Sequence, residues 1–275
     1  TDVGVMRVNS KTWKEIPWDY GVEVDSFYFD SGSAPRRAMP SVSNLKLPPM
    51  RPVHWILMSM DVNAKGNLAV ACYAASAGAK AEKNEPVYQS KTSSDVYKLV
   101  NYPGRGSPYF VNIWDKSGKL LKEDCFPGMP FTDGLGIDQN NDIYTLIGGV
   151  RYLNEKDSFT EFTETLVKVV PNKGRIITTS ERALVVLPQS EAPKRAPDIS
   201  VPGFGKSWIE NAEWMYGGVG FAGFSVGFAP ACACWNARFS VDVLKRSFAP
   251  EISHYSVAVL DSNGNLIMRI GQYGN

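Results

Sequence analysis

Two strand-turn-strand patterns alternate along this chain, and their alternation limits its possible folds more than any other feature. The first pattern is an aliphatic residue or methionine followed by aspartate, a polar turn and an apolar strand; it begins at Met60, Ile137 and Val241. The second is an apolar strand, a four-residue turn ending in glycine and another apolar strand; it begins at Phe110, Leu166 and Val257. Each pattern predicts a β-hairpin, so each successive pair predicts a four-stranded antiparallel unit.

The turns of the second pattern share a glycine at their last position: Gly118, Gly174 and Gly264. Glycine is suited to the positive φ that such turns require, so we expect the three residues to occupy equivalent hairpin turns.

The first pattern repeats a carboxylate, which we expect at equivalent strand ends: Asp61, Asp138 and Asp242. A residue at a repeated position usually has the same structural task in each unit, here accepting backbone N–H groups. A ring of calcium-binding or catalytic carboxylates is the alternative interpretation.

Several of the expected strands are apolar on both faces, which indicates sheets that are covered on both sides. In the strand that starts at Phe110, Val111 and Ile113 point to one face, while Phe110 and Trp114 point to the other. Stacked four-stranded sheets of this kind are typical of propeller blades. The sequence therefore predicts an all-β fold, a β-propeller of four-stranded antiparallel blades with long insertions.

At these residues the chain resembles the NHL-repeat β-propellers. The resemblance lies in SVAVLDSNGNLIMRIGQYGN (256–275) and GLGIDQNNDIYTLIGG (134–149), which look like the end of one repeat and the opening of another. The stretch CWNARFSVDVLKRSFAPEISHYSVAVLD (234–261) also resembles large NHL-type proteins of environmental bacteria, planctomycetes among them. NHL-like propellers include peptidylglycine amidating lyases and are similar to gluconolactonases. The resemblance thus implies, as one option, a metal-dependent lyase or a lactonase-like hydrolase.

The spacing of the repeats departs from that family. The three aspartates of the first pattern lie much farther apart than the roughly 40 residues of one blade. Three blades are legible, whereas a closed propeller has four to eight. We therefore expect an N-terminal wrap or partial blade in 1–55, blades in 56–275 with an insertion at about 180–235, and an incomplete propeller or a part of a larger polypeptide.

Two segments near that insertion carry predictions of their own. Residues 188–202 are rich in proline and read as an exposed excursion. Residues 206–216 are the best helix candidate, because Trp208, Ile209, Ala212 and Met215 would share one helical face.

Composition argues against nucleic acid and membrane as partners. The net charge is only +1, so no global field attracts phosphate. The run 214–237 has no charged residue, but its many glycines favour a buried loop over a spanning helix.

Catalytic signatures are sparse. The chain has two histidines, His54 and His254, and it has no Gly-x-Ser-x-Gly elbow, phosphate-binding loop or dinucleotide fingerprint. This scarcity favours a non-catalytic binding or scaffold propeller, as a subunit of a larger assembly with a protein partner.

The closest approach to a metal site is the Cys-x-Cys pair Cys232 and Cys234, to which His254 or Glu251 could return on the next hairpin. Such a set could bind zinc; calcium would need oxygen ligands. Packing, or a disulfide to Cys72 or Cys125, is the alternative, and a disulfide would favour export to the periplasm or cell exterior. No other cofactor is predicted.

Aromatic side chains near the glycine-rich run form a candidate ligand or partner surface: Trp208, Trp214, Tyr216 and Trp235. Such residues can stack on carbohydrate or anchor a protein, and core packing is the alternative.

Overall fold

The computed structural model describes residues 8–14, 16, 28–30, 35–37, 59–73, 87–89, 96–98, 100–107, 109–130, 132–154, 158–159, 163–201, 203–220 and 238–271. Apart from two short 3-10 turns, η1 (Gln189–Glu191) and η2 (Ile252–His254), the regular elements in these ranges are β-strands. The all-β class is therefore confirmed. Among the described residues, no helix has the length and apolar character needed to span a membrane.

The described residues form four four-stranded antiparallel sheets, which we number I to IV. Sheet I contains β3 (Met60–Val62), β4 (Leu68–Tyr73), β7 (Tyr109–Trp114) and β8 (Leu120–Lys122). Sheet II contains β9 (Thr132–Ile137), β10 (Ile143–Ile147), β12 (Glu164–Val169) and β16 (Ala212–Val219). Sheet III contains β17 (Ser240–Val241), β18 (Ser247–Glu251), β19 (Ser256–Leu260) and β20 (Leu266–Ile270). In each of the three, neighbouring strands follow one another in sequence order.

Sheet IV interrupts this plan. It contains β11 (Val150–Arg151), β14 (Ile199–Val201), β15 (Gly205–Glu210) and β13 (Arg175–Thr178), in that order across the sheet. Three of its strands are inserted between β12 and β16, the third and fourth strands of sheet II. Two short hairpins, β1 (Tyr28–Asp30) with β2 (Pro35–Arg37) and β5 (Val87–Gln89) with β6 (Val96–Lys98), are separate from these sheets.

This insertion overturns the hairpin predicted around Gly174. The strands on either side of Gly174, β12 and β13, belong to sheets II and IV, and the positive φ of their connection is taken by Asn172, at 64°. Gly174 is needed for space, since an added Cβ would lie 2.7 Å from Cγ1 of Val169. The other two predicted glycines, Gly118 and Gly264, do lie in equivalent turns, with φ of 89° and 80°.

The helix predicted over 206–216 is also wrong. The segment forms the strands β15 and β16, which are separated by Asn211 at a φ of 53°. The apolar residues that would share a helical face are instead divided between two sheets, because each strand pairs with different neighbours. The predicted excursion at 188–202 is wrong at its end, where Ile199 and Val201 are buried in β14.

One turn geometry joins the paired strands of sheets I, II and III five times. The side-chain oxygen of the first turn residue accepts hydrogen bonds from the backbone N–H groups two and four positions later. The first residues of the five turns are Asn63, Asp115, Asp138, Asp242 and Asp261. The fourth residue has positive φ in every copy: Gly66, Gly118, Asn141, Lys245 and Gly264. Asp138 and Asp242 therefore are equivalent, as predicted. Asp61 is not, because Asn63 takes that position two residues later.

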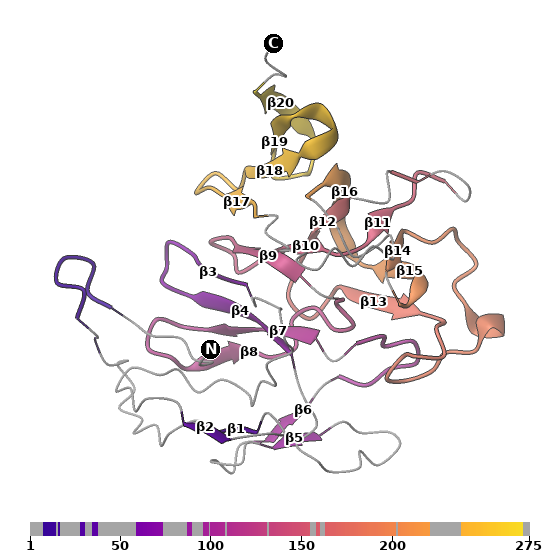
Figure 1. Ribbon diagram of the computed structural model, residues 1–275, viewed down its shortest axis with the longest axis horizontal. Helices are drawn as coiled ribbons and strands as arrows, with labels where there is room; N and C mark the ends of the chain where they lie inside the picture. Colours follow the sequence, from indigo (N-terminus) through magenta and orange to yellow (C-terminus); the bar gives the residue numbers. More distant parts are fainter. Residues whose placement is uncertain are drawn as a thin grey trace.

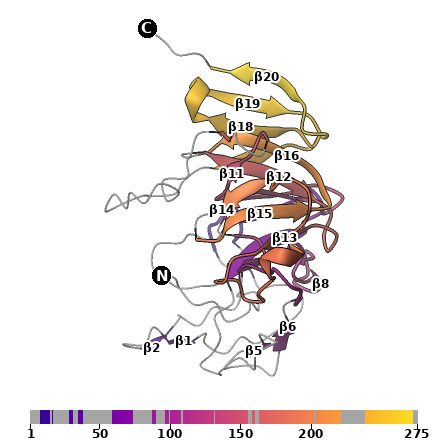
Figure 2. The same ribbon diagram turned by 90° about the vertical axis from the view of Figure 1, so that its right-hand side faces the viewer.

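Sheet II lies between its neighbours and is buried on both faces. One face packs against sheets I and IV through residues such as Ile143, Val167 and Ile113. The other packs against sheet III through Leu146, Leu166, Ala249, Ala258 and Leu260. The expected burial of β7 on both faces is likewise confirmed. In Figure 2, the strands of sheet III lie above those of sheet II.

The first strands of sheets I, II and III lie side by side. β9 contacts both β3 and β17, and Figure 1 shows β3 and β17 at the edges of sheets I and III that are turned towards β9. Strands that are far apart in sequence therefore meet along one line. The candidate site lies on this line.

Candidate functional site

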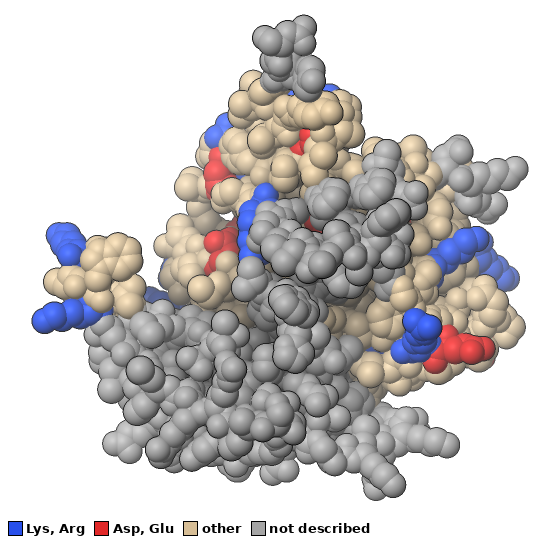
Figure 3. All heavy atoms as spheres, viewed as in Figure 1, with Lys and Arg blue, Asp and Glu red and all other residues tan. Residues whose placement is uncertain are grey.

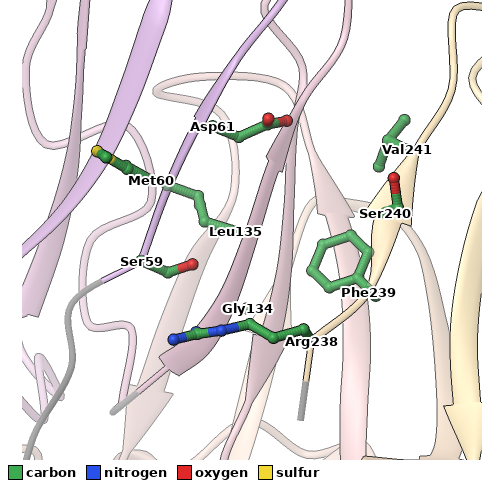
Figure 4. Close-up of a pocket in the computed structure, with 9 residues that line it drawn as sticks. All are labelled: Ser59, Met60, Asp61, Gly134, Leu135, Arg238, Phe239, Ser240 and Val241. Atoms are coloured by element: carbon green, nitrogen blue, oxygen red, sulfur yellow. The ribbon is translucent and has the colours of Figure 1, made fainter. Parts of the chain in front are cut away.

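A cavity of about 340 Å³ opens where the first strands of three sheets meet (Figure 4). Its lining comes from three short segments: Ser59 to Asp61 at β3, Gly134 and Leu135 in β9, and Arg238 to Val241 leading into β17. A volume of this size suits a small molecule or a single side chain of a partner. We call this hollow the central cavity.

Asp61 supplies the carboxylate of the central cavity. Its Oδ2 accepts the backbone N–H of Ile137 at 2.9 Å, which fixes the side chain against sheet II. Burial raises the pKa of Asp61, and the hydrogen bond from Ile137 offsets only part of that effect. A carboxylate whose charge is poorly solvated favours a cationic or hydrogen-bond-donating ligand.

Arg238 supplies a positive charge in the same cavity. Its side chain is exposed, and within the described ranges no ion pair or hydrogen bond engages its guanidinium. Figure 4 shows the side chain extended across the cavity past Gly134, with its guanidinium on the same side of the view as Ser59 and with Asp61 at the opposite end. Ser59 and Ser240 add two hydroxyls.

Glycines in β9 allow sheet III to approach sheet II beside the cavity. An added Cβ on Gly134 would lie 2.9 Å from Cδ1 of Phe239, and one on Gly136 would lie 2.8 Å from Cγ2 of Val241. Real Cβ atoms do not approach other atoms so closely. The absence of side chains at these two positions therefore places Phe239 and Val241 in the cavity wall.

A second hollow, of about 410 Å³, lies between β16, η2 and β20 and is called the outer groove. It contains Tyr216 and His254, which the sequence singled out for different reasons. Both surround Glu251, whose side chain is only 3% exposed. Oε1 of Glu251 accepts the Tyr216 hydroxyl at 2.8 Å, and Oε2 accepts Nε of Arg269 at 2.6 Å.

The charges of the outer groove satisfy one another. Burial and the Glu251 carboxylate raise the pKa of Tyr216 to about 12. Burial also disfavours the charged form of Glu251, but the hydrogen bonds from Arg269 and Tyr216 outweigh it and hold the Glu251 pKa below its usual range. This cluster ties β16, β18 and β20 together. The central cavity, whose two charges do not pair, is the better candidate for binding.

The metal site predicted from Cys232, Cys234 and His254 lies mostly outside the described residues, which include only His254. The His254 side chain is 53% exposed, with Nδ1 3.9 Å from Oε2 of Glu251. In the described ranges, no three histidine, cysteine or acidic side chains gather as a metal site would require. Cys125 is buried and forms no disulfide, and burial raises the pKa of its thiol.

The predicted aromatic surface is divided in the structure. Trp208 is buried in sheet IV, and its Nε1 donates to the carbonyl of Arg195 at 2.9 Å. Trp214 packs between sheets II and III, where it donates to the carbonyl of Ser262 and meets the Tyr144 ring edge-on. Trp235 lies outside the described residues. These roles for Trp208 and Trp214 are structural.

Sequence reasoning did not single out Arg238, Ser59 or Ser240. These residues are far apart in the chain, and no local motif connects them. The only signal was the alternation of Gly134 and Gly136 within a strand, which indicates a close approach of backbone or side chain.

Figure 3 shows basic and acidic groups scattered over the described surface of this face, without an extended patch of one sign. That distribution is in keeping with the balanced charge of the sequence.

No model of a known protein family matches the chain, and a search of curated proteins returns no match. The resemblance to NHL repeats therefore stays a prediction.

Proposed function

We propose that this chain is a non-catalytic binding protein of the β-propeller type, and that it binds its ligand in the central cavity. One observation carries the proposal: segments at the first strands of sheets I and III bring a carboxylate, a guanidinium and two hydroxyls to a single hollow, and β9 of sheet II completes its wall. Strand order within sheets I to III, their burial against one another and the repeated turn support the propeller assignment. The lining supplies charge and hydroxyl groups for recognition.

Ligand-observed NMR with a library of small polar molecules tests this function. Ser240→Trp should abolish binding, because Ser240 is exposed at the cavity and an indole there would fill it. Lys119→Trp is the matched control, since Lys119 is exposed in the turn between β7 and β8. Molecules that bind the native chain and Lys119→Trp but not Ser240→Trp support the proposal. The absence of any binder, or equal binding to all three proteins, contradicts it.

The scaffold part of the proposal rests on the outward face of sheet III. Pairing register places six apolar residues on the face turned away from sheet II: Phe248, Pro250, Val257, Val259, Met268 and Ile270. Met268 is 52% exposed and Ile270 is 49% exposed. We propose that sheet III of a second copy covers this face, because an apolar face can bury itself against its own image. Arg246, whose guanidinium lies 5.8 Å from the centre of the Phe248 ring at the edge of this face, is already paired with Asp242.

Light scattering over a range of protein concentrations tests this assembly. The native chain is expected to form dimers, and the double variant Met268→Glu, Ile270→Glu is expected to remain monomeric because each face would then carry two negative charges. A native chain that is monomeric at every concentration would rule out the second copy as the occupant.

A further inference from the structure

We propose that the ligand of the central cavity is a small zwitterion, with its carboxylate at Arg238 and its ammonium group at Asp61. This inference rests on the proposed function and adds the chemical class of the ligand. The geometry behind it is the separation of two opposite charges within one hollow (Figure 4).

Opposite charges that share one hollow attract each other, and flexible side chains normally respond by pairing. Asp61 and Arg238 form no ion pair within 4.0 Å. Asp61 is held by the N–H of Ile137, at the end of the cavity away from the guanidinium. Figure 4 also shows Leu135 between the two charged ends, with the Phe239 ring to one side.

A ligand with one charge would pair with only one of the two charged side chains. An anion at Arg238 would leave the Asp61 carboxylate without a counter-charge, and a cation at Asp61 would leave the Arg238 guanidinium without one. A zwitterion satisfies both ends. Its apolar spacer would lie against Leu135, with Phe239 in the cavity wall beside it.

The Arg238 end is better suited to the carboxylate than to any other part of such a ligand. A guanidinium binds a carboxylate through two parallel hydrogen bonds. The Ser59 hydroxyl lines the same cavity and can donate another. Asp61, once its Oδ2 has accepted from Ile137, retains Oδ1 to accept from an ammonium group.

Titration calorimetry with ω-amino acids of increasing chain length tests the inference. The series is glycine, β-alanine, 4-aminobutyrate and 6-aminohexanoate, and each is compared with the alkyl carboxylate and alkylamine of the same length. We expect one length to bind best, at least tenfold more tightly than its singly charged counterparts.

Two variants assign the ends. The Arg238→Gln variant should bind the preferred amino acid no more tightly than it binds the alkylamine of the same length. The Asp61→Asn variant should bind that amino acid no more tightly than it binds the alkyl carboxylate of the same length. The side-chain amide introduced by Asp61→Asn would still offer an oxygen to the N–H of Ile137, so the variant is expected to fold, and its melting temperature checks this.

The outcomes separate this inference from the proposed function. If singly charged molecules bind as tightly as amino acids, or if no amino acid binds while other small molecules do, the ligand is not a zwitterion, although the cavity still binds. If the amino acid binds Ser240→Trp as tightly as the native chain, the central cavity is not the binding site and both proposals fail.

Discussion

The side-chain amide of Asn63 donates a hydrogen bond to the backbone carbonyl of Asp138 at 2.8 Å, and this contact joins the first turn of sheet I to the first turn of sheet II. The same amide donates to Oδ1 of Asn141, while Oδ1 of Asn63 accepts two N–H groups of its own turn. One side chain therefore shapes a turn and holds two sheets in register beside the cavity.

Replacing Asn63 should affect stability more than replacing its counterpart in an exposed turn. Asn63→Ala loses the local turn bonds and the bonds to sheet II, and at about 1 kcal/mol for each net hydrogen bond we expect a loss of about 2–3 kcal/mol. Asp261→Ala loses only local bonds, so it should lower stability less. Urea unfolding of both variants measures the difference, and equal losses would show that the cross-sheet bonds contribute nothing.

Gly264 combines a φ of 80° with a close approach to Trp214, whose Cδ2 would lie 2.6 Å from an added Cβ. Gly205 has a φ of 70° but nothing within 4 Å. We expect Gly205→Ala to cost about 1 kcal/mol through backbone strain alone. Gly264→Ala should cost about 3 kcal/mol, because the indole must also move. Similar unfolding free energies for the two variants would contradict the packing of Trp214 on this turn.

Asp61 should reduce stability at neutral pH. Its pKa is raised in the folded chain, so the folded state binds a proton more readily than the unfolded state, and stability falls as pH rises through that range. Asp61→Asn removes this cost and keeps an acceptor for Ile137. We therefore expect the variant to melt at an equal or higher temperature at pH 7, with the difference disappearing below pH 3.8, the ordinary value for the group. A lower melting temperature at pH 7 would contradict this role.

Glu251 should have the opposite pH dependence. Its pKa is lowered in the folded chain, so its contribution to stability is complete above the ordinary value of 4.5 and is lost as pH falls below it. Glu251→Gln should therefore lower the melting temperature at pH 7, and the gap to the native chain should narrow towards pH 3. Glu181→Gln, at an exposed position, is the control and should track the native chain throughout. A gap that stays constant with pH would show that the Glu251 charge is not involved.

Periodicity was sufficient to predict the hairpins that begin at Met60, Ile137 and Val241, because their two strands are neighbours in sequence and pair locally. It failed around Gly174, where two adjacent apolar strands join different sheets. Which strand pairs with β12 depends on tertiary packing, and a local pattern does not contain that information.

The turns were located but their chemistry was only partly understood. Asn141 and Lys245 adopt the positive φ that glycine has in the other copies of the turn. In the first turn of sheet I, Asn63 takes the position that aspartate has elsewhere. The pattern based on aspartate therefore placed the repeat at Asp61, two residues too early. The central cavity was beyond prediction, because it depends on how three distant segments converge.

The insertion of sheet IV also bears on the order in which the chain can fold. Sheet II is completed only when β16 pairs with β12, and the whole segment that forms β13, β14 and β15 lies between these two strands in sequence. Closing that loop costs entropy unless the segment is already compact. Sheet IV can form much of its own pairing first, since β14 joins β15 by a short connection and β15 pairs with β13. Once folded, the inserted sheet reduces the length of flexible chain between β12 and β16, so less entropy is lost when these two strands pair. The rate at which sheet II forms therefore depends on residues that lie outside it.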